Sequence, residues 1–220
     1  ELLRTFMPGE AFPDQDEAQA AEELVKALDG YTLALELIGA SVAVDWEEGD
    51  RLQDHLATLE EKGLASTDQL AGDSDVQHRI QHRQKRIGLI IEDSLKTLER
   101  QLAVKHGPEM AAAAQQIIEM ASLLQPDTIP SEWLDALLKQ IHPDLESTRK
   151  KRLAPWNIIR QALVRLSLLS PAERRSGEQE ESTDVLRVHR VTAAHIANAL
   201  TDDGDWNWNQ IELYLNGLAQ

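Results

Sequence analysis

The segment Leu186–Thr192 combines residue types that suggest a binding site, because it contains His189 between a predicted strand and a predicted helix. Val185–Val188 has the composition of a short strand, and a helix is predicted from about residue 192 to 200. The imidazole of His189 would then lie near a helix N-terminus, where backbone N–H groups and the helix dipole favour an anion. The residues leave two interpretations open: a histidine that binds an anion, or one that caps the helix or packs beneath the strands.

Metal-ligand spacing occurs at one pair among the seven histidines. His78 and His82 are four residues apart on a predicted helix, but Arg79 and Arg83 lie beside them, and cations disfavour a metal ion. Zinc normally needs three or four ligands. The acidic segment 202–205 resembles the start of a calcium loop but lacks a glutamate at the twelfth position. We therefore expect no metal site.

Enzyme motifs are absent from the sequence. It contains no G-x-x-x-x-G-K-[ST], G-x-G-x-x-G, H-E-x-x-H or G-x-S-x-G. It also contains no cysteine, which excludes disulfides, thiolate metal sites and cysteine nucleophiles. The acids of the first helix are expected to form a solvated face (Asp14, Asp16, Glu17, Glu22 and Glu23). No pair of carboxylates can be assigned as acid and base, so we expect no catalytic residue in this chain.

Basic residues in the second half of the chain raise the question of DNA binding. Lys150, Lys151 and Arg152 precede a predicted helix that carries Arg160 and Arg165. In a DNA-binding winged helix, such residues would contact phosphates around the recognition helix. The alternative is a solvated loop before an apolar helix whose arginine side chains extend to solvent.

The distribution of charge argues against nucleic acid as a partner. The 220-residue chain has 38 acidic and 22 basic residues, a net charge of −16. Residues 1–75 contain 19 acidic and four basic residues, whereas residues 76–220 contain 19 and 18. An acidic surface repels phosphate backbones and anionic membranes. The asymmetry also indicates two units, and no apolar run reaches the roughly 18 residues of a membrane-spanning helix.

Hydrophobic periodicity predicts a bundle of four helices in the first half of the chain. The helices are expected around residues 21–28, 33–44, 52–59 and 87–102. The second of them is apolar nearly all round, which predicts a central, buried helix. Asp29-Gly30 and Gly63 are the stop signals of the first and third helices. A polar stretch at 66–77 is expected to be a loop.

The second half of the chain has the pattern of a winged helix. Helices beginning near Met110, Ile129 and Pro155 are followed by short strands at Leu166–Leu169 and Val185–Val188, and then by a closing helix. This succession is typical of the winged-helix variant of the helix-turn-helix. We therefore expect a mainly α protein with a helical bundle at 1–107, a winged-helix domain with a two-stranded wing at 108–200, and a terminal helix at 201–220 that either docks back or begins a further domain.

Two parts of the sequence resemble one family. Residues 22–40 (EELVKALDGYTLALELIGA) resemble the G-L-P-L-A-L segment of the NB-ARC, or AP-ATPase, branch of STAND nucleotide switches. A later series is similar to the winged-helix part of the same family: Ala121–Leu124, Ile129–Pro130, Trp133–Leu134, Leu163–Leu169 and Val188–Arg190. The resemblance covers residues 1 to about 200. It implies the bundle and winged-helix portion of a longer cytoplasmic chain whose P-loop ATPase domain would come first.

The resemblance also implies ADP contacts at four residues. In the family, a histidine at the end of the last winged-helix strand contacts the β-phosphate of ADP, and His189 occupies the matching position. Gly30, Tyr31 and Thr32 match the family's G-x-P segment near the adenine, with Thr32 in place of the proline. ADP or ATP with magnesium would be bound by the parent chain, and none is expected on this fragment alone.

The implied function is that of a regulatory fragment of a nucleotide switch. The winged helix would latch the ADP-bound closed state, and its release would permit oligomerisation and signalling. The parent chain would be an ATPase, although this fragment lacks the Walker residues. Partners would be the upstream ATPase domain, a downstream sensor domain and further copies, with neither nucleic acid nor membrane. The alternatives are a winged-helix transcriptional regulator with an acidic sensing or dimerisation domain, and an enzyme with an unrecognised helical active site.

Overall fold

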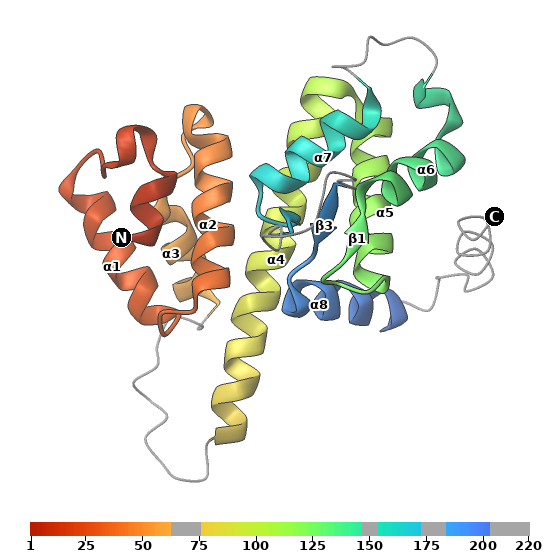
Figure 1. Cartoon of the computed structure of the whole chain (residues 1–220). Helices are drawn as coiled ribbons and strands as arrows, with labels where there is room; N and C mark the ends of the chain where they lie inside the picture. The colour runs from red at the N-terminus through yellow and green to blue at the C-terminus, as the bar shows by residue number, and fades with distance from the viewer. Residues whose placement is uncertain (63–75, 147–153, 173–183, 203–220) are drawn as a thin grey trace, which may run out of the picture. The chain divides into compact units, whose positions relative to one another are not determined.

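The computed structural model describes residues 1–62, 76–146, 154–172 and 184–202 (Figure 1). The chain is mainly α-helical and contains a small three-stranded antiparallel sheet. Its contacts divide it into two compact units, Glu1–Ser94 and Leu95–Gln220, and the division falls inside one long helix. No helix within the described ranges is both long and apolar enough to cross a membrane.

The first unit contains the four helices that the sequence predicts. They are α1 (Gln15–Ala27), α2 (Thr32–Asp45), α3 (Leu52–Glu61) and the part of α4 (Val76–His106) that ends at Ser94. Three short 3-10 helices accompany them: η1 (Leu2–Phe6), η2 (Pro8–Glu10) and η3 (Trp46–Glu48). Most of the predicted loop at 66–77 lies outside the described residues.

Helix α2 forms the centre of the first unit, as its apolar sequence predicts. Leu33, Leu37 and Ile38 are all buried, together with the small residues between them. A helix with no polar face must be covered on several sides. Here η1 and α3 pack against α2, and α1 packs against α3.

The second unit has the element order of a winged helix. After the remainder of α4 come α5 (Pro108–Leu123), β1 (Ile129–Pro130), α6 (Ser131–Ile141), η4 (Pro143–Glu146), α7 (Pro155–Arg165), β2 (Ser170–Pro171), β3 (Val185–Arg187) and α8 (Arg190–Asp202). The strands are ordered β1-β3-β2, with Ile129 opposite Leu186 and Ser170 opposite Arg187. Helix α5 packs against α6, α7 and α8, and therefore forms the core of this unit.

The predicted strand at Leu166–Leu169 is wrong. These residues form the turn that ends α7, where the N–H groups of Leu168 and Leu169 both donate to the carbonyl of Leu163. Ser167 has a φ of 56°, so the chain reverses at this point, and β2 begins only at Ser170. The leucines were mistaken for a strand because a short buried apolar run has no distinctive period.

The sheet also contains a strand that the sequence analysis assigned to a helix. Ile129 and Pro130 were expected to start a helix, but they pair with β3, and α6 begins at Ser131. The sheet thus has three strands instead of two. The sequence placed the first domain border at residue 107, where Gly107 separates α4 from α5. The predicted terminal helix falls almost entirely beyond Asp202, outside the described residues.

Candidate functional site

His189 caps the N-terminus of α8. Its backbone carbonyl accepts from the N–H of Ala193 at 2.9 Å, and its ring Nδ1 accepts from the N–H of Val191 at 3.2 Å. The structure therefore bears out the capping interpretation. Because an acceptor nitrogen carries no hydrogen, the neutral ring has its hydrogen on Nε2. The residue is exposed to solvent.

The surroundings of His189 are positively charged. Arg190 follows it directly, and Arg187 precedes it at the end of β3, where its Nε donates to Ser170 Oγ at 2.8 Å. Asp127, in the turn between α5 and β1, accepts from both Nε and Nη2 of Arg190. This hydrogen bond is the main reason that the pKa of Asp127 is lowered, and the charges of Arg187 and His189 add to the effect. The Asp127 carboxylate thus lies among the basic side chains at this end of the wing.

Gly30, Tyr31 and Thr32 form the turn between α1 and α2 in the first unit. Gly30 has a φ of 63°, and its N–H donates to the carbonyl of Val25 at 2.8 Å, a contact that ends α1. Gly30 and Thr32 are exposed, and Thr32 is the first residue of α2. The structure places these three residues together, whereas His189 belongs to the second unit. Their contact with ADP stays a prediction.

Two arginines of α4 pack against this same turn. The Arg83 guanidinium lies over the Tyr31 ring, 4.6 Å from its centroid. Arg86 is buried, and its Nη1 donates to the carbonyl of Ala27 at the end of α1. Burial lowers the pKa of Arg86, and the charge of Asp29 partly opposes that effect. Arg86 is therefore held against the end of α1 and not on a solvated face.

Helix α7, the counterpart of a DNA recognition helix, offers few exposed polar groups. Arg160 forms an ion pair with Asp184, with 2.6 Å between Nη2 and Oδ2. Gln161 and Arg165 are the exposed residues of α7. The basic residues at 150–152 lie outside the described ranges.

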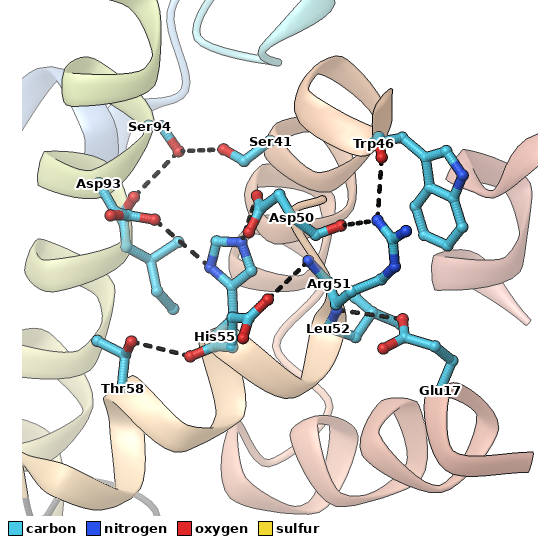
Figure 2. A network of polar contacts seen from close by, with 12 residues as sticks. Glu17, Ser41, Trp46, Asp50, Arg51, Leu52, His55, Thr58, Asp93 and Ser94 are labelled. Carbon is cyan, nitrogen blue, oxygen red and sulfur yellow. Dashed lines mark hydrogen bonds and ion pairs between the residues drawn. The ribbon is translucent and has the colours of Figure 1, made fainter. Parts of the chain in front are cut away.

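A partly buried polar network in the first unit was not anticipated from the sequence (Figure 2). At its centre, His55 of α3 contacts a carboxylate through each ring nitrogen. Nε2 lies 3.1 Å from Oδ2 of Asp50, and Nδ1 lies 3.4 Å from Oδ2 of Asp93 on α4. The His55 side chain is 12% exposed. Nearby, the hydroxyls of Ser41 and Ser94 lie 3.5 Å apart.

The segment that leads into α3 is held by the same network. Arg51 is the N-cap residue: its N–H donates to Asp54 Oδ2 at 3.0 Å, and its Nη1 donates to the carbonyls of Trp46 and Asp50. Its guanidinium lies 4.0 Å from the Trp46 ring centroid. Glu17 of α1 accepts from the N–H of Leu52 at 3.2 Å and is only 2% exposed. The expectation that Glu17 belongs to a solvated face is therefore wrong.

The pKa of His55 results from opposing effects. Burial alone would lower it, because the charged ring loses hydration. The hydrogen bond and charge of Asp50, together with the charges of Asp93 and Asp54, outweigh burial, and the pKa is raised above 6.5. The imidazolium form is thus stabilised by the fold.

Within the described residues, no group of three or more histidine and acidic side chains is placed to hold a metal ion. The contacts of His55 with Asp50 and Asp93 are those of an ion-pair network.

Comparisons with protein-family models, with curated proteins and with solved structures find no match for this chain. The resemblance to STAND switches rests on the sequence motifs alone. Its functional consequences are accordingly proposals.

Proposed function

We propose that this chain is a regulatory part of a cytoplasmic STAND-type nucleotide switch, in which the winged-helix unit contacts bound ADP. One observation carries the proposal: Nδ1 of His189 accepts from the N–H of Val191, which leaves the hydrogen of the neutral ring on Nε2. An exposed ring at the start of α8 then offers a donor where the helix dipole also favours an anion. The nucleotide itself would be bound mainly by an upstream P-loop ATPase domain.

In this proposal, the Nε2–H group of His189 donates to a phosphate oxygen in the ADP state. The contact stabilises the closed arrangement of the winged-helix unit and the ATPase domain. A switch needs such differential binding, and a coupling of about 1–3 kcal/mol is the usual scale. Exchange of ADP for ATP would release the winged helix and permit oligomerisation with further copies. A downstream sensor domain would bias the same equilibrium.

The Arg190–Asp127 pair supports a positive site whose occupant can exchange. Both side chains are substantially exposed, with 77% of Arg190 and 48% of Asp127 accessible. Exposed ion pairs contribute little to stability and are readily rearranged. A phosphate group could therefore replace the Asp127 carboxylate as the partner of Arg190 at small cost.

The proposal is tested by two substitutions of His189 in the intact parent protein. His189→Ala removes both the cap and the donor, whereas His189→Ser restores a capping oxygen but is too short to replace Nε2. Both variants should lose ADP on purification and oligomerise without stimulus, and only His189→Ala should also lower the melting temperature. ADP occupancy equal to that of the wild type in both variants would contradict the proposal. So would the absence of a phosphate-loop motif about 150–250 residues upstream.

The second candidate is a DNA-binding winged-helix regulator. The order of helices and strands in the second unit favours it, as does the lack of acidic residues on α7. The ion pair of Arg160 with Asp184 argues against it, because this guanidinium is already engaged. A gel-shift assay at about 50 mM salt distinguishes the two, since phosphate contacts are strongest at low salt. A salt-sensitive shift that is lost in Arg165→Gln would favour the regulator.

A further inference from the structure

We propose that His55 is a pH-sensitive clasp that attaches α4 to α3 in the first unit, closed when its ring is protonated and loosened when the proton leaves. This device is independent of the nucleotide switch proposed above. It uses none of the residues assigned to ADP, and it would operate in either candidate function.

The geometry around the ring favours a positive charge, because each ring nitrogen faces a carboxylate oxygen. Oδ2 of Asp50 lies 3.1 Å from Nε2, and Oδ2 of Asp93 lies 3.4 Å from Nδ1. Ionised carboxylates only accept hydrogen bonds, and a neutral imidazole has only one N–H group. A neutral ring would therefore place one bare nitrogen against a carboxylate oxygen. The imidazolium ion alone satisfies both contacts.

The clasp joins different parts of the first unit. Asp50 precedes α3 and Asp93 lies on α4, so the ring links two segments that are far apart in the sequence. Its side chain is 12% exposed, compared with 23% for Asp50 and 48% for Asp93. The contact with Asp50 is the better shielded from water, and the exposed Asp93 is the contact that can open.

The charged groups around the ring are predominantly acidic. Helix α3 contributes Asp54, and the last residue of α2 is the buried Asp45, whose carbonyl accepts from the N–H of Asp50. Glu17 of α1 binds the start of α3. The nearby cation, Arg51, is directed to the Trp46 ring and to two backbone carbonyls. Loss of the His55 proton would leave these acids without their central positive charge.

The direction of the pH effect follows from the raised pKa. A group whose pKa is higher in the folded state contributes its full stabilisation below its unfolded value, here 6.5. That stabilisation is lost as the pH rises through the folded value. The clasp is therefore closed in mildly acidic solution and opens on the alkaline side. The first unit therefore responds to changes of pH close to neutrality.

Two measurements on the full chain test the clasp. Imidazole nitrogen NMR should show hydrogens on both nitrogens of His55 at pH 6.5, with its signal assigned by its loss in His55→Gln. Amide exchange, corrected for the intrinsic rate, should show that the protection of residues 52–61 and 83–94 falls on raising the pH from 6.5 to 8.5. We expect a fall of roughly tenfold, which corresponds to about 1.4 kcal/mol. The protection of residues 108–123 in α5 should not fall with rising pH.

Variants of α4 keep the test valid if His55→Gln does not fold. Asp93→Asn removes a half-exposed charge and should reduce the pH dependence of protection in both segments. Glu99→Gln removes the same charge from an exposed position of α4 outside the network. This control should leave the pH dependence of protection unchanged. The proposal is overturned if His55 has one bare nitrogen at pH 6.5. It is equally overturned if amide protection depends on pH to the same extent in the wild type and in Asp93→Asn.

Discussion

Among the glycines that the structure describes, Gly39 has the least room for a side chain. A Cβ at this residue, in the middle of α2, would lie 2.5 Å from Cδ2 and 2.8 Å from Cγ of the Phe6 ring. Gly39→Ala should gain about 0.8–1 kcal/mol in helix propensity, but over-packing typically costs about 1–3 kcal/mol. We therefore expect a net destabilisation of up to about 2 kcal/mol. The ring cannot yield easily because Cγ is close to its attachment point.

A double-mutant cycle isolates the contact. In a Phe6→Ala background the ring is gone, so Gly39→Ala should change sign and stabilise the protein by about 0.8–1 kcal/mol. Urea denaturation of all four proteins, followed by far-UV circular dichroism, gives the free energies of unfolding. If Gly39→Ala stabilises the protein while Phe6 is present, the segment η1 does not pack on α2 and the reasoning fails.

Two further predictions concern the second unit. Burial raises the pKa of Glu119 on α5, although the hydrogen bond from Gln115 opposes this. The pKa of Glu119 in the folded protein exceeds the ordinary 4.5, so folding stability is lost as the pH rises through the folded pKa. Glu119→Gln should remove this pH dependence of stability and raise the urea midpoint at pH 7. Trp156→Phe removes the buried bond of 3.1 Å from Nε1 to Ser131 Oγ and should cost about 1–2 kcal/mol, measured by thermal unfolding. An unchanged melting temperature would mean that α7 does not rely on this bond to hold the start of α6.

The helices could be predicted because their signals are local. Asp14 caps α1 by accepting from the N–H of Glu17, and Gly30 ends the same helix with a positive φ. The apolar circumference of α2 predicted its central place. The wing was harder, because the pairing partner of Ile129 lies beyond two helices, at Leu186. A strand of two residues is too short to show an alternating pattern in the sequence.

The two candidate sites likewise differ in whether their signals are local in the sequence. His189 could be singled out because the strand before it and the helix after it are contiguous in the chain. The contacts of His55 could not, because Asp93 comes from a helix that the sequence only shows to be amphipathic. Asp50 and Asp54 both precede His55 by five residues or fewer, but acids are so common in residues 1–75 that their spacing carries no signal. The decisive information is which face of α4 meets α3, and that is set by packing.

The two histidines respond to a proton in opposite ways. His55 needs its extra proton, because both ring nitrogens face carboxylate oxygens. His189 needs Nδ1 without a hydrogen, because this atom accepts from the N–H of Val191. A proton on the His55 ring therefore strengthens its contacts with both carboxylates, whereas a hydrogen on Nδ1 of His189 would be incompatible with the side-chain cap of α8. The two residues lie in different units, so the two proton positions act on separate sets of contacts.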